Sequence, residues 1–221
     1  FKPFFDGRFS ATALYILTHY QSPEKIANMN AKSYEALRKK SRGKFSMVKF
    51  AQLKTLAKNT VGRSDAFLLK QMEITIDIEN QLDAKIDEIE SQILECIRAL
   101  NPPILTIPGI GELTAAIILS EYGNINKFEN PAQLLSFAGL EPGYYQSGLA
   151  EHQGHMVKHG SSHLRYALMN ACLPLITYEP VFAEYYAKKR AEGKPHRVAL
   201  THVAKKLLRV IFTLQTKNIS Y

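Results

Sequence analysis

The longest regular pattern in the chain lies between residues 65 and 100, where apolar side chains recur at steps of three and four positions. This interval contains neither Gly nor Pro, so nothing in it interrupts a helix. We therefore predict one helix of about 50 Å, at a rise of about 1.5 Å per residue. Its stripe is typical of a coiled coil and needs a partner helix, from another chain or from its own domain. The stripe consists of Ile78, Leu82, Ile86, Ile89, Ile93, Ile97 and Leu100.

Shorter helices are predicted before this stripe, within residues 8–60. Ser10 can cap the first of them, and Pro23 suits the first turn of the second. Residues 32–40 have the pattern of a third helix, which Gly43 interrupts. The segment is also rich in Lys and Arg, which is compatible either with a solvated helical surface or with a surface that faces phosphate or RNA.

A compact, mostly helical domain is expected after residues 101–103, because the Asn-Pro-Pro sequence there cannot continue an α-helix. We expect loops at residues 123–130 and 139–160, and no segment has a strong strand pattern. The tail, residues 188–217, is predicted to be one amphipathic basic helix that docks its apolar side and leaves the other to RNA or DNA.

The predicted fold class is therefore mainly α. A helical bundle with a long coiled-coil helix is followed by a compact helical domain that contains a helix-hairpin-helix. The expected divisions are a helical segment over residues 1–64, the long helix over residues 65–102, and the carboxy-terminal domain over residues 103–221.

Composition excludes several classes of protein. Hydrophobic residues make up 46% of the chain, too many for a disordered protein. The longest apolar run is residues 115–119, far too short to cross a membrane. The two cysteines, Cys96 and Cys172, cannot build a disulfide framework or a four-cysteine metal site. A reducing, cytoplasmic setting is expected.

The charge of the chain favours a polyanionic partner, because the formal net charge is +8 and the pI is about 9.4. The surplus is uneven along the sequence. Eight acidic residues face one basic residue between Glu73 and Glu95, whereas five acidic residues face eleven basic ones between Glu141 and Tyr221. We therefore expect nucleic acid to contact the carboxy-terminal part.

Residues 105–118 contain a helix-hairpin-helix pattern, with a Gly-apolar-Gly turn before an Ala- and Ile-rich helix. Gly109 and Gly111 allow a tight turn and a close approach to a phosphate, and Ile110 anchors the turn in the core. N–H groups at the following helix start can bind that phosphate without reading the base sequence. The alternative is a hairpin with a purely structural role.

Residues 138–165 carry the most informative motifs. Ala-Gly-Leu-x-Pro and Gln-Ser-Gly are followed by Lys-x-Gly and Leu-Arg, all after the Ile-Pro-Gly-Ile-Gly turn. In this order the motifs resemble the transposase domain of the bridge-RNA-guided insertion-sequence recombinases. The resemblance is close over residues 104–172 and loose over the whole chain.

The resemblance implies a serine nucleophile for DNA strand exchange, and Ser147 holds the matching position. A hydroxyl beside glycine is open to a bulky phosphate but needs activation. In that family a RuvC-like domain supplies four acidic residues and Mg²⁺. No matching tetrad occurs here, so this chain alone is expected to be inactive and to follow such a domain. The implied contacts to DNA or guide RNA are Gly109, Ile110, Gly111, Tyr145, Gln146, Gly148, Lys158, Gly160 and Arg165.

The remaining alternatives differ in what they require. A tyrosine recombinase needs an Arg-His-Arg constellation and a terminal tyrosine, which we do not find. Four histidines between residues 152 and 163 lack cysteine or acidic co-ligands, so no metal site is assigned to this chain. Two non-catalytic functions stay open: a nucleic-acid-binding scaffold built on the helix-hairpin-helix, and a coiled-coil assembly module. The expected partners are DNA, a guide RNA and further copies of the chain through the 65–100 helix, with no membrane.

Overall fold

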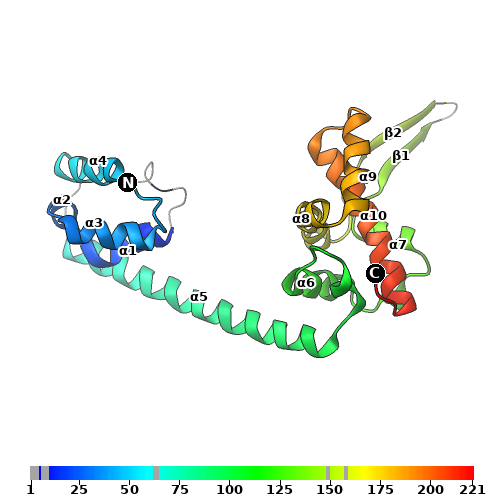
Figure 1. Ribbon diagram of the computed structural model, residues 1–221, viewed down its shortest axis with the longest axis horizontal. Helices are drawn as coiled ribbons and strands as arrows, with labels where there is room; N and C mark the ends of the chain where they lie inside the picture. The colour runs from blue at the N-terminus through cyan, green and yellow to red at the C-terminus, as the bar shows by residue number, and fades with distance from the viewer. Residues whose placement is uncertain (1–4, 6–9, 62–64, 148–149, 157–158) are drawn as a thin grey trace. The chain divides into compact units, whose positions relative to one another are not determined.

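The computed structural model describes residue 5 and residues 10–61, 65–147, 150–156 and 159–221, with the backbone alone at 142–155. Two compact units form, Phe1–Asp87 and Glu88–Tyr221. The division lies inside the long helix α5 (Ala66–Leu100), which begins in unit 1 and ends in unit 2. Helices dominate both units, as Figure 1 shows, so the predicted mainly-α class is confirmed.

Unit 1 contains four short helices whose starts are set by side-chain caps. Ser10 Oγ accepts a hydrogen bond from the Ala13 N–H at 3.3 Å, and Asn30 forms a capping box with Ser33. Both the Ser10 cap and the proline-started second helix agree with the prediction. These helices are α1 (Ala11–Tyr20), α2 (Pro23–Ala27), α3 (Ala31–Lys40) and α4 (Met47–Lys58).

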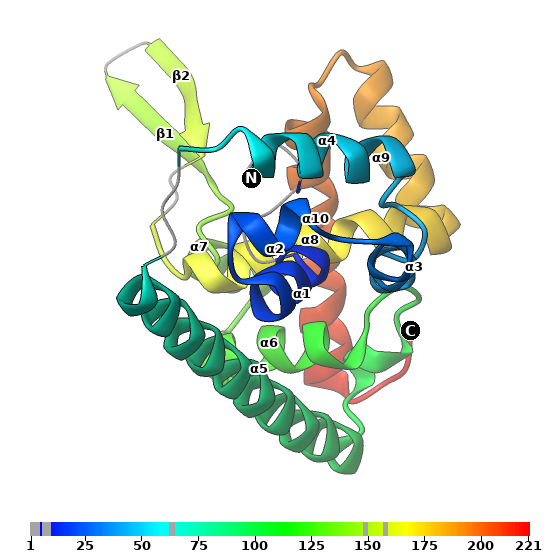
Figure 2. The same ribbon diagram turned by 90° about the vertical axis from the view of Figure 1, so that its left-hand side faces the viewer.

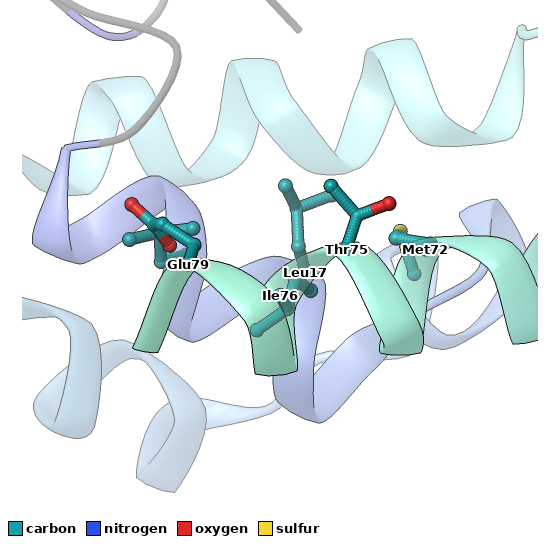
Figure 3. Close-up of a pocket in the computed structure, with 6 residues that line it drawn as sticks. Leu17, Met72, Thr75, Ile76 and Glu79 are labelled. Atoms are coloured by element: carbon teal, nitrogen blue, oxygen red, sulfur yellow. The ribbon is translucent and has the colours of Figure 1, made fainter. Parts of the chain in front are cut away.

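The core of unit 1 is small, which explains why its helices need good caps. The fully or almost fully buried side chains come from all four helices and the turn before α4, and Lys54 Nζ also donates to the Met29 carbonyl across the unit. An apolar pocket of about 230 Å³ lies between α1 and the first half of α5; Figure 3 shows Leu17, Met72 and Ile76 in its wall. The core consists of Ile16, Ile26, Met29, Leu37, Phe45, Phe50 and Leu53.

The predicted long helix is confirmed by α5, which is 35 residues long. Most of its apolar stripe is exposed: Ile78, Leu82 and Ile86 are each more than half accessible. Ile97, near its end, is buried. The stripe therefore has no partner along much of α5 among the residues that the structure describes.

Unit 2 is arranged around its last helix, α10 (His196–Lys217), whose apolar side is buried from Ala199 to Leu214. In Figure 1 this helix runs through the unit, and it contacts α7, α8, α9 and the two 3-10 helices. The other elements are η2 (Pro103–Thr106), α6 (Glu112–Tyr122), η3 (Ile125–Lys127), α7 (Pro131–Phe137), β1 (Pro142–Ser147), β2 (Ala150–Met156), α8 (Ser162–Tyr178) and α9 (Pro180–Ala191).

Two local predictions need correction. The segment 139–160 was expected to be a loop, but β1 and β2 pair in it as an antiparallel hairpin. A two-stranded ribbon satisfies its backbone hydrogen bonds without a buried face, so its sequence needs no alternation of apolar and polar residues. The tail is also not one helix. Gly193, with a left-handed φ of 79°, and Pro195 separate α9 from α10.

Within the described residues, none of the helices has the length and apolar character that crossing a membrane requires.

Candidate nucleic-acid interface

The hairpin that carries Ser147 is anchored at one end and extends from the helices of unit 2, as Figures 1 and 2 show. At the base of the hairpin, Pro142 pairs with Met156, and Met156 packs against the core of unit 2. Leu140, two residues before Pro142, is fully buried in that core. At its other end, Ser147 closes β1 and pairs with Ala150. Five residue steps of about 3.3 Å place Ser147 about 16 Å from the base.

The register places other candidate residues along the same ribbon. Tyr145 pairs with His152, and Gln146 pairs with Glu151. Two of the predicted contact residues, Gly148 and Lys158, lie outside the described residues. The ladder is irregular between Pro142 and Tyr144, where an extra residue lies on one strand. The structure therefore brings Tyr145, Gln146 and Ser147 together at successive positions of one strand.

The turn at residues 107–111 serves mainly to pack unit 2. Gly109 has a left-handed φ of 87°, and a Cβ there would lie 3.0 Å from the backbone of Pro174 in α8. Ile110 is buried, as predicted. The helix before the turn is only the four-residue 3-10 helix η2, so the first helix of the expected helix-hairpin-helix is reduced to one short turn. Packing against α8 therefore accounts for Gly109 without a phosphate.

The start of α6 holds a charge pair. Gly111 is its N-cap and provides no side chain to cap it, and a Cβ there would meet nothing within 4 Å. Arg98 donates two hydrogen bonds, of 2.8 and 2.7 Å, to the carboxylate of Glu112. The guanidinium thereby holds the pKa of Glu112 below its usual value, and Glu112 raises the pKa of Arg98. A phosphate at this helix start would be repelled by the negative charge of the Glu112 carboxylate, which Arg98 partly offsets.

Gly160 and Arg165 join the start of α8 to the end of α7. Gly160 has a left-handed φ of 97°, and a Cβ there would overlap the Phe137 carbonyl. Arg165 donates to the Ala138 carbonyl at 3.0 Å, which satisfies an unpaired group at the end of α7. Sequence reasoning placed Arg165 at a phosphate and counted Gly160, as a turn residue, among the nucleic-acid contacts. The structure places both residues where they hold the start of α8 against the end of α7.

Ser161 completes this junction, together with a residue that sequence reasoning missed. Its N–H donates to the Phe137 carbonyl at 2.8 Å, and its hydroxyl donates to Glu121 at 2.5 Å while accepting from the Leu164 N–H. Glu121 had no signal in the sequence, because its partner lies 40 positions away. Ser161 is also the N-cap of α8.

Basic residues of α9 and α10 lie close to one another, and one of them, Lys205, interacts with Glu141 just before the hairpin. Burial lowers the pKa of Lys205, Arg209 lowers it further, and Glu141 at the start of the hairpin raises it. Burial also lowers the pKa of His202, and the positive charges of Lys189, Lys205 and Lys194 act in the same direction. Several cations close to one histidine create a positive potential that suits a phosphate backbone.

Some cations in this region are held by the fold. Lys206 donates to the Val181 carbonyl at 3.2 Å and lies 5.0 Å above the rings of both Phe182 and Tyr185. Lys189 pairs with Glu192 at 2.8 Å. Arg209 makes no side-chain hydrogen bond or ion pair among the described residues, whereas the charge of Lys194 acts on Glu192 and lowers its pKa.

The region around the hairpin is similar to known proteins. Residues 101–187 match the IS116/IS110/IS902 family of transposases. The matched segment begins where α5 ends and contains Ser147, the Gly109 turn and the junction at Gly160. It ends within α9, so neither unit 1 nor α10 contributes to the match.

Curated relatives extend the likeness. The chain is 33% identical to an uncharacterized 43.6 kDa protein of insertion element IS110 from Streptomyces coelicolor, over 57% of this chain and 32% of that protein. It is 31% identical to the pilin gene-inverting protein of Moraxella bovis, over 64% of this chain and 44% of that protein. An uncharacterized 42 kDa protein of IS900 from Mycobacterium paratuberculosis is 25% identical over 98% of this chain and 56% of that protein. The chain thus spans about a third to just over half of these relatives.

Proposed function

We propose that this chain is part of a DNA transposase or recombinase. The match of residues 101–187 to a transposase family carries the proposal, because that domain includes the whole Ser147 hairpin. The names of the relatives also support the proposal. They include insertion-element proteins and a protein that inverts a pilin gene, and both activities rearrange DNA. Such a protein works where the chromosome is, in the cytoplasm of a bacterial or archaeal cell.

Within this function we assign Ser147 as the nucleophile. Its hydroxyl oxygen attacks a phosphorus atom of the DNA backbone and forms a phosphoserine bond, while a deoxyribose oxygen leaves and takes up a proton. The serine proton passes to a base. The position of Ser147 at the end of a two-stranded ribbon, well away from the buried core, favours access by a duplex. Tyr145 and Gln146 precede it on the same strand and are proposed DNA or RNA contacts, as are Gly148 and Lys158.

A serine needs activation, and this chain offers no metal site for it among the residues that the structure describes. No group of three or more His, Cys, Asp or Glu side chains there could hold a metal ion. The described residues therefore do not fit Mg²⁺. We propose that the acidic residues that bind Mg²⁺ belong to a RuvC-like domain outside this chain, and that the active site is composite.

DNA and a guide RNA are the proposed nucleic-acid partners, and a second copy of the chain is the proposed protein partner. The exposed stripe of α5 supports the latter. In unit 2 the stripe continues into an apolar groove of about 490 Å³ between the end of α5 and α6, lined among others by Ile93, Leu100 and Ile117. Burial of such a surface in an oligomer removes apolar area from water.

The decisive experiment measures strand exchange by the full-length protein with its RNA and Mg²⁺, together with trapping of a covalent protein–DNA adduct. Ser147→Ala is expected to abolish both, with a loss of activity of at least about 10³-fold, while DNA binding persists. Ser136→Ala, at an exposed serine of α7, is the matched control and is expected to react normally.

Normal exchange by Ser147→Ala would contradict the assignment of the nucleophile. If the full-length wild-type protein bound nucleic acid but never joined or exchanged strands, the alternative of a non-catalytic binding and oligomerisation module would replace the proposal.

A further inference from the structure

A second concentration of positive charge lies well before residues 101–187 in the sequence. Residues 31–58 contain one acidic residue, Glu35, and so many basic ones that their surplus equals the formal net charge of +8 of the whole chain. All of this segment lies in unit 1, outside the matched residues 101–187. The basic residues are Lys32, Arg38, Lys39, Lys40, Arg42, Lys44, Lys49, Lys54 and Lys58.

The fold concentrates these charges at the turn between α3 and α4. Arg38, Lys39 and Lys40 form the last turn of α3. The chain then reverses through Arg42 and Gly43, which both have left-handed backbones, with φ of 53° and 81°. The Gly43 N–H donates to the Arg38 carbonyl and so closes the helix end. The reversal places Arg42 beside the cations of the preceding helical turn.

A depression of about 280 Å³ lies at this turn. Its lining consists of Glu35, Arg38, Lys39, Arg42 and Gly43. The three basic side chains are exposed, and Glu35 is the only acid in the wall. We call Arg38, Lys39 and Arg42 the α3 basic cluster. The turn has no side chain at Gly43, where a Cβ would meet nothing within 4 Å, so the backbone there is open to an approaching group.

The α3 basic cluster has no acidic partners among the described residues, although the fold pairs other cations nearby. Lys54 donates to the Met29 carbonyl and lies over the Phe50 ring, and Lys70 forms an ion pair with Glu73. The side chains of the three cluster residues make no hydrogen bond or ion pair within the described chain. Their charges are therefore not used to stabilise unit 1.

Helix electrostatics do not account for the cluster. Cations at a helix carboxyl end offset a partial charge of about half a unit. Arg38, Lys39, Lys40, Arg42 and Lys44 together exceed that charge about tenfold. The surplus repels itself and disfavours the folded unit. A charge arrangement that costs stability and has no internal partner indicates a partner that brings negative charge.

We propose that the α3 basic cluster of unit 1 binds the phosphodiester backbone of a nucleic acid. Two Arg residues flank the depression, and the planar guanidinium group can donate two parallel hydrogen bonds to one phosphate. No aromatic side chain lines the depression, so the contact holds the backbone rather than reading bases. The protein thus has one phosphate-binding surface in each unit. This goes beyond the proposed strand exchange and does not depend on Ser147.

The test uses the complete chain and fluorescence anisotropy with two labelled probes of one base sequence, a duplex DNA and a duplex RNA. The cluster variant is R38Q/K39Q/R42Q. The matched control, K25Q/K70Q/K127Q, removes the same charge from three exposed lysines elsewhere. A charge-preserving variant, R38K/R42K, separates the effect of charge from that of the guanidinium geometry. Thermal melting of every variant checks that the fold is intact.

The cluster variant is expected to bind at least about tenfold more weakly at 100 mM salt, with a slope of log K against log salt that is smaller by about 0.9 for each lost phosphate contact. The control is expected to change affinity by less than about threefold. R38K/R42K keeps the charge but loses the two parallel hydrogen bonds of each guanidinium, so it is expected to bind more weakly than the wild type and more tightly than the cluster variant. A loss with only one of the two duplexes also supports the proposal and identifies the partner as DNA or RNA.

Equal losses in the cluster variant and the control would overturn the proposal, because net charge alone would then explain them. No loss in the cluster variant would also overturn it. So would a loss of binding to phosphatidylglycerol vesicles with unchanged binding to both duplexes, which would assign the surface to a membrane. Strand exchange by Ser147→Ala is a separate measurement, so either proposal can fail alone.

Discussion

Two glycines of unit 2 share a left-handed backbone but differ in what surrounds them. At Gly160 a Cβ would overlap the carbonyl of Phe137, whereas at Gly193 a Cβ would meet nothing within 4 Å. The first glycine is needed for both conformation and space, and the second for conformation alone. The Gly160 junction therefore sets the position of the hairpin base with little tolerance.

We predict that Gly160→Ala lowers the free energy of unfolding by about 3 kcal/mol, because a strained backbone and a backbone overlap act together. Gly193→Ala is the matched control and should lower it by about 1 kcal/mol. Urea unfolding followed by circular dichroism measures both. Equal effects of the two substitutions would show that the contact with Phe137 does not constrain this junction.

At the scale of single elements, α5 stands out because its apolar stripe is exposed while its flanks are acidic. Ile86 is 52% exposed, an unusual state for one member of a regular stripe of large aliphatic side chains. Acidic residues along both flanks would repel a parallel copy of the helix, so self-association should strengthen as salt screens them.

We predict that Ile86→Gln weakens self-association of the chain at least about tenfold, since an apolar contact worth about 1.5 kcal/mol or more is lost. Ala84→Gln, off the stripe but equally exposed on the same helix, should leave it unchanged. Sedimentation velocity over a range of protein concentrations measures the effect. A chain that is monomeric at every concentration would exclude α5 as the oligomer contact.

On the scale of the whole molecule, charge is divided between separate regions. Unit 1 has its basic cluster at the end of α3, unit 2 has cations around His202, and α5 carries eight of the 20 acidic residues. An elongated polyanion is therefore attracted to both ends of the sequence and repelled from its middle.

The effect of the cations near His202 can be measured through the pH dependence of folding stability. Its pKa is lowered in the folded chain, so between about pH 6.5 and the folded pKa the unfolded chain binds more protons. Folding stability should therefore fall as pH drops through that window, and His202→Gln should flatten the fall. Thermal melting at pH 5.5 and 7.5 tests this. An identical pH dependence in the variant would show that other groups cause it.

Bound phosphate should act on the same group in the opposite direction. A phosphate beside His202 favours the protonated ring, so nucleic-acid binding should take up a proton and tighten as pH falls.

The sequence by itself determined the features that depend on near neighbours. Ser10 caps the first helix, the Asn-Pro-Pro sequence at residues 101–103 follows the end of α5, and the stripe of α5 is visible because helical periodicity is local. The motifs between residues 104 and 172 were sufficient to indicate the transposase family that residues 101–187 match.

Only the tertiary structure decided what the special residues do. Gly160 and Arg165 contact the end of α7, more than 20 positions earlier, and Ser161 reaches Glu121. Contacts between such distant positions cannot be predicted from the pattern of neighbouring residues in the sequence. The hairpin was equally hidden, because a ribbon with no second layer imposes no alternation on its sequence. The α3 basic cluster could be recognised only in the structure, for the same reason. Whether a cation is paired or free depends on side chains that folding brings to it from distant positions.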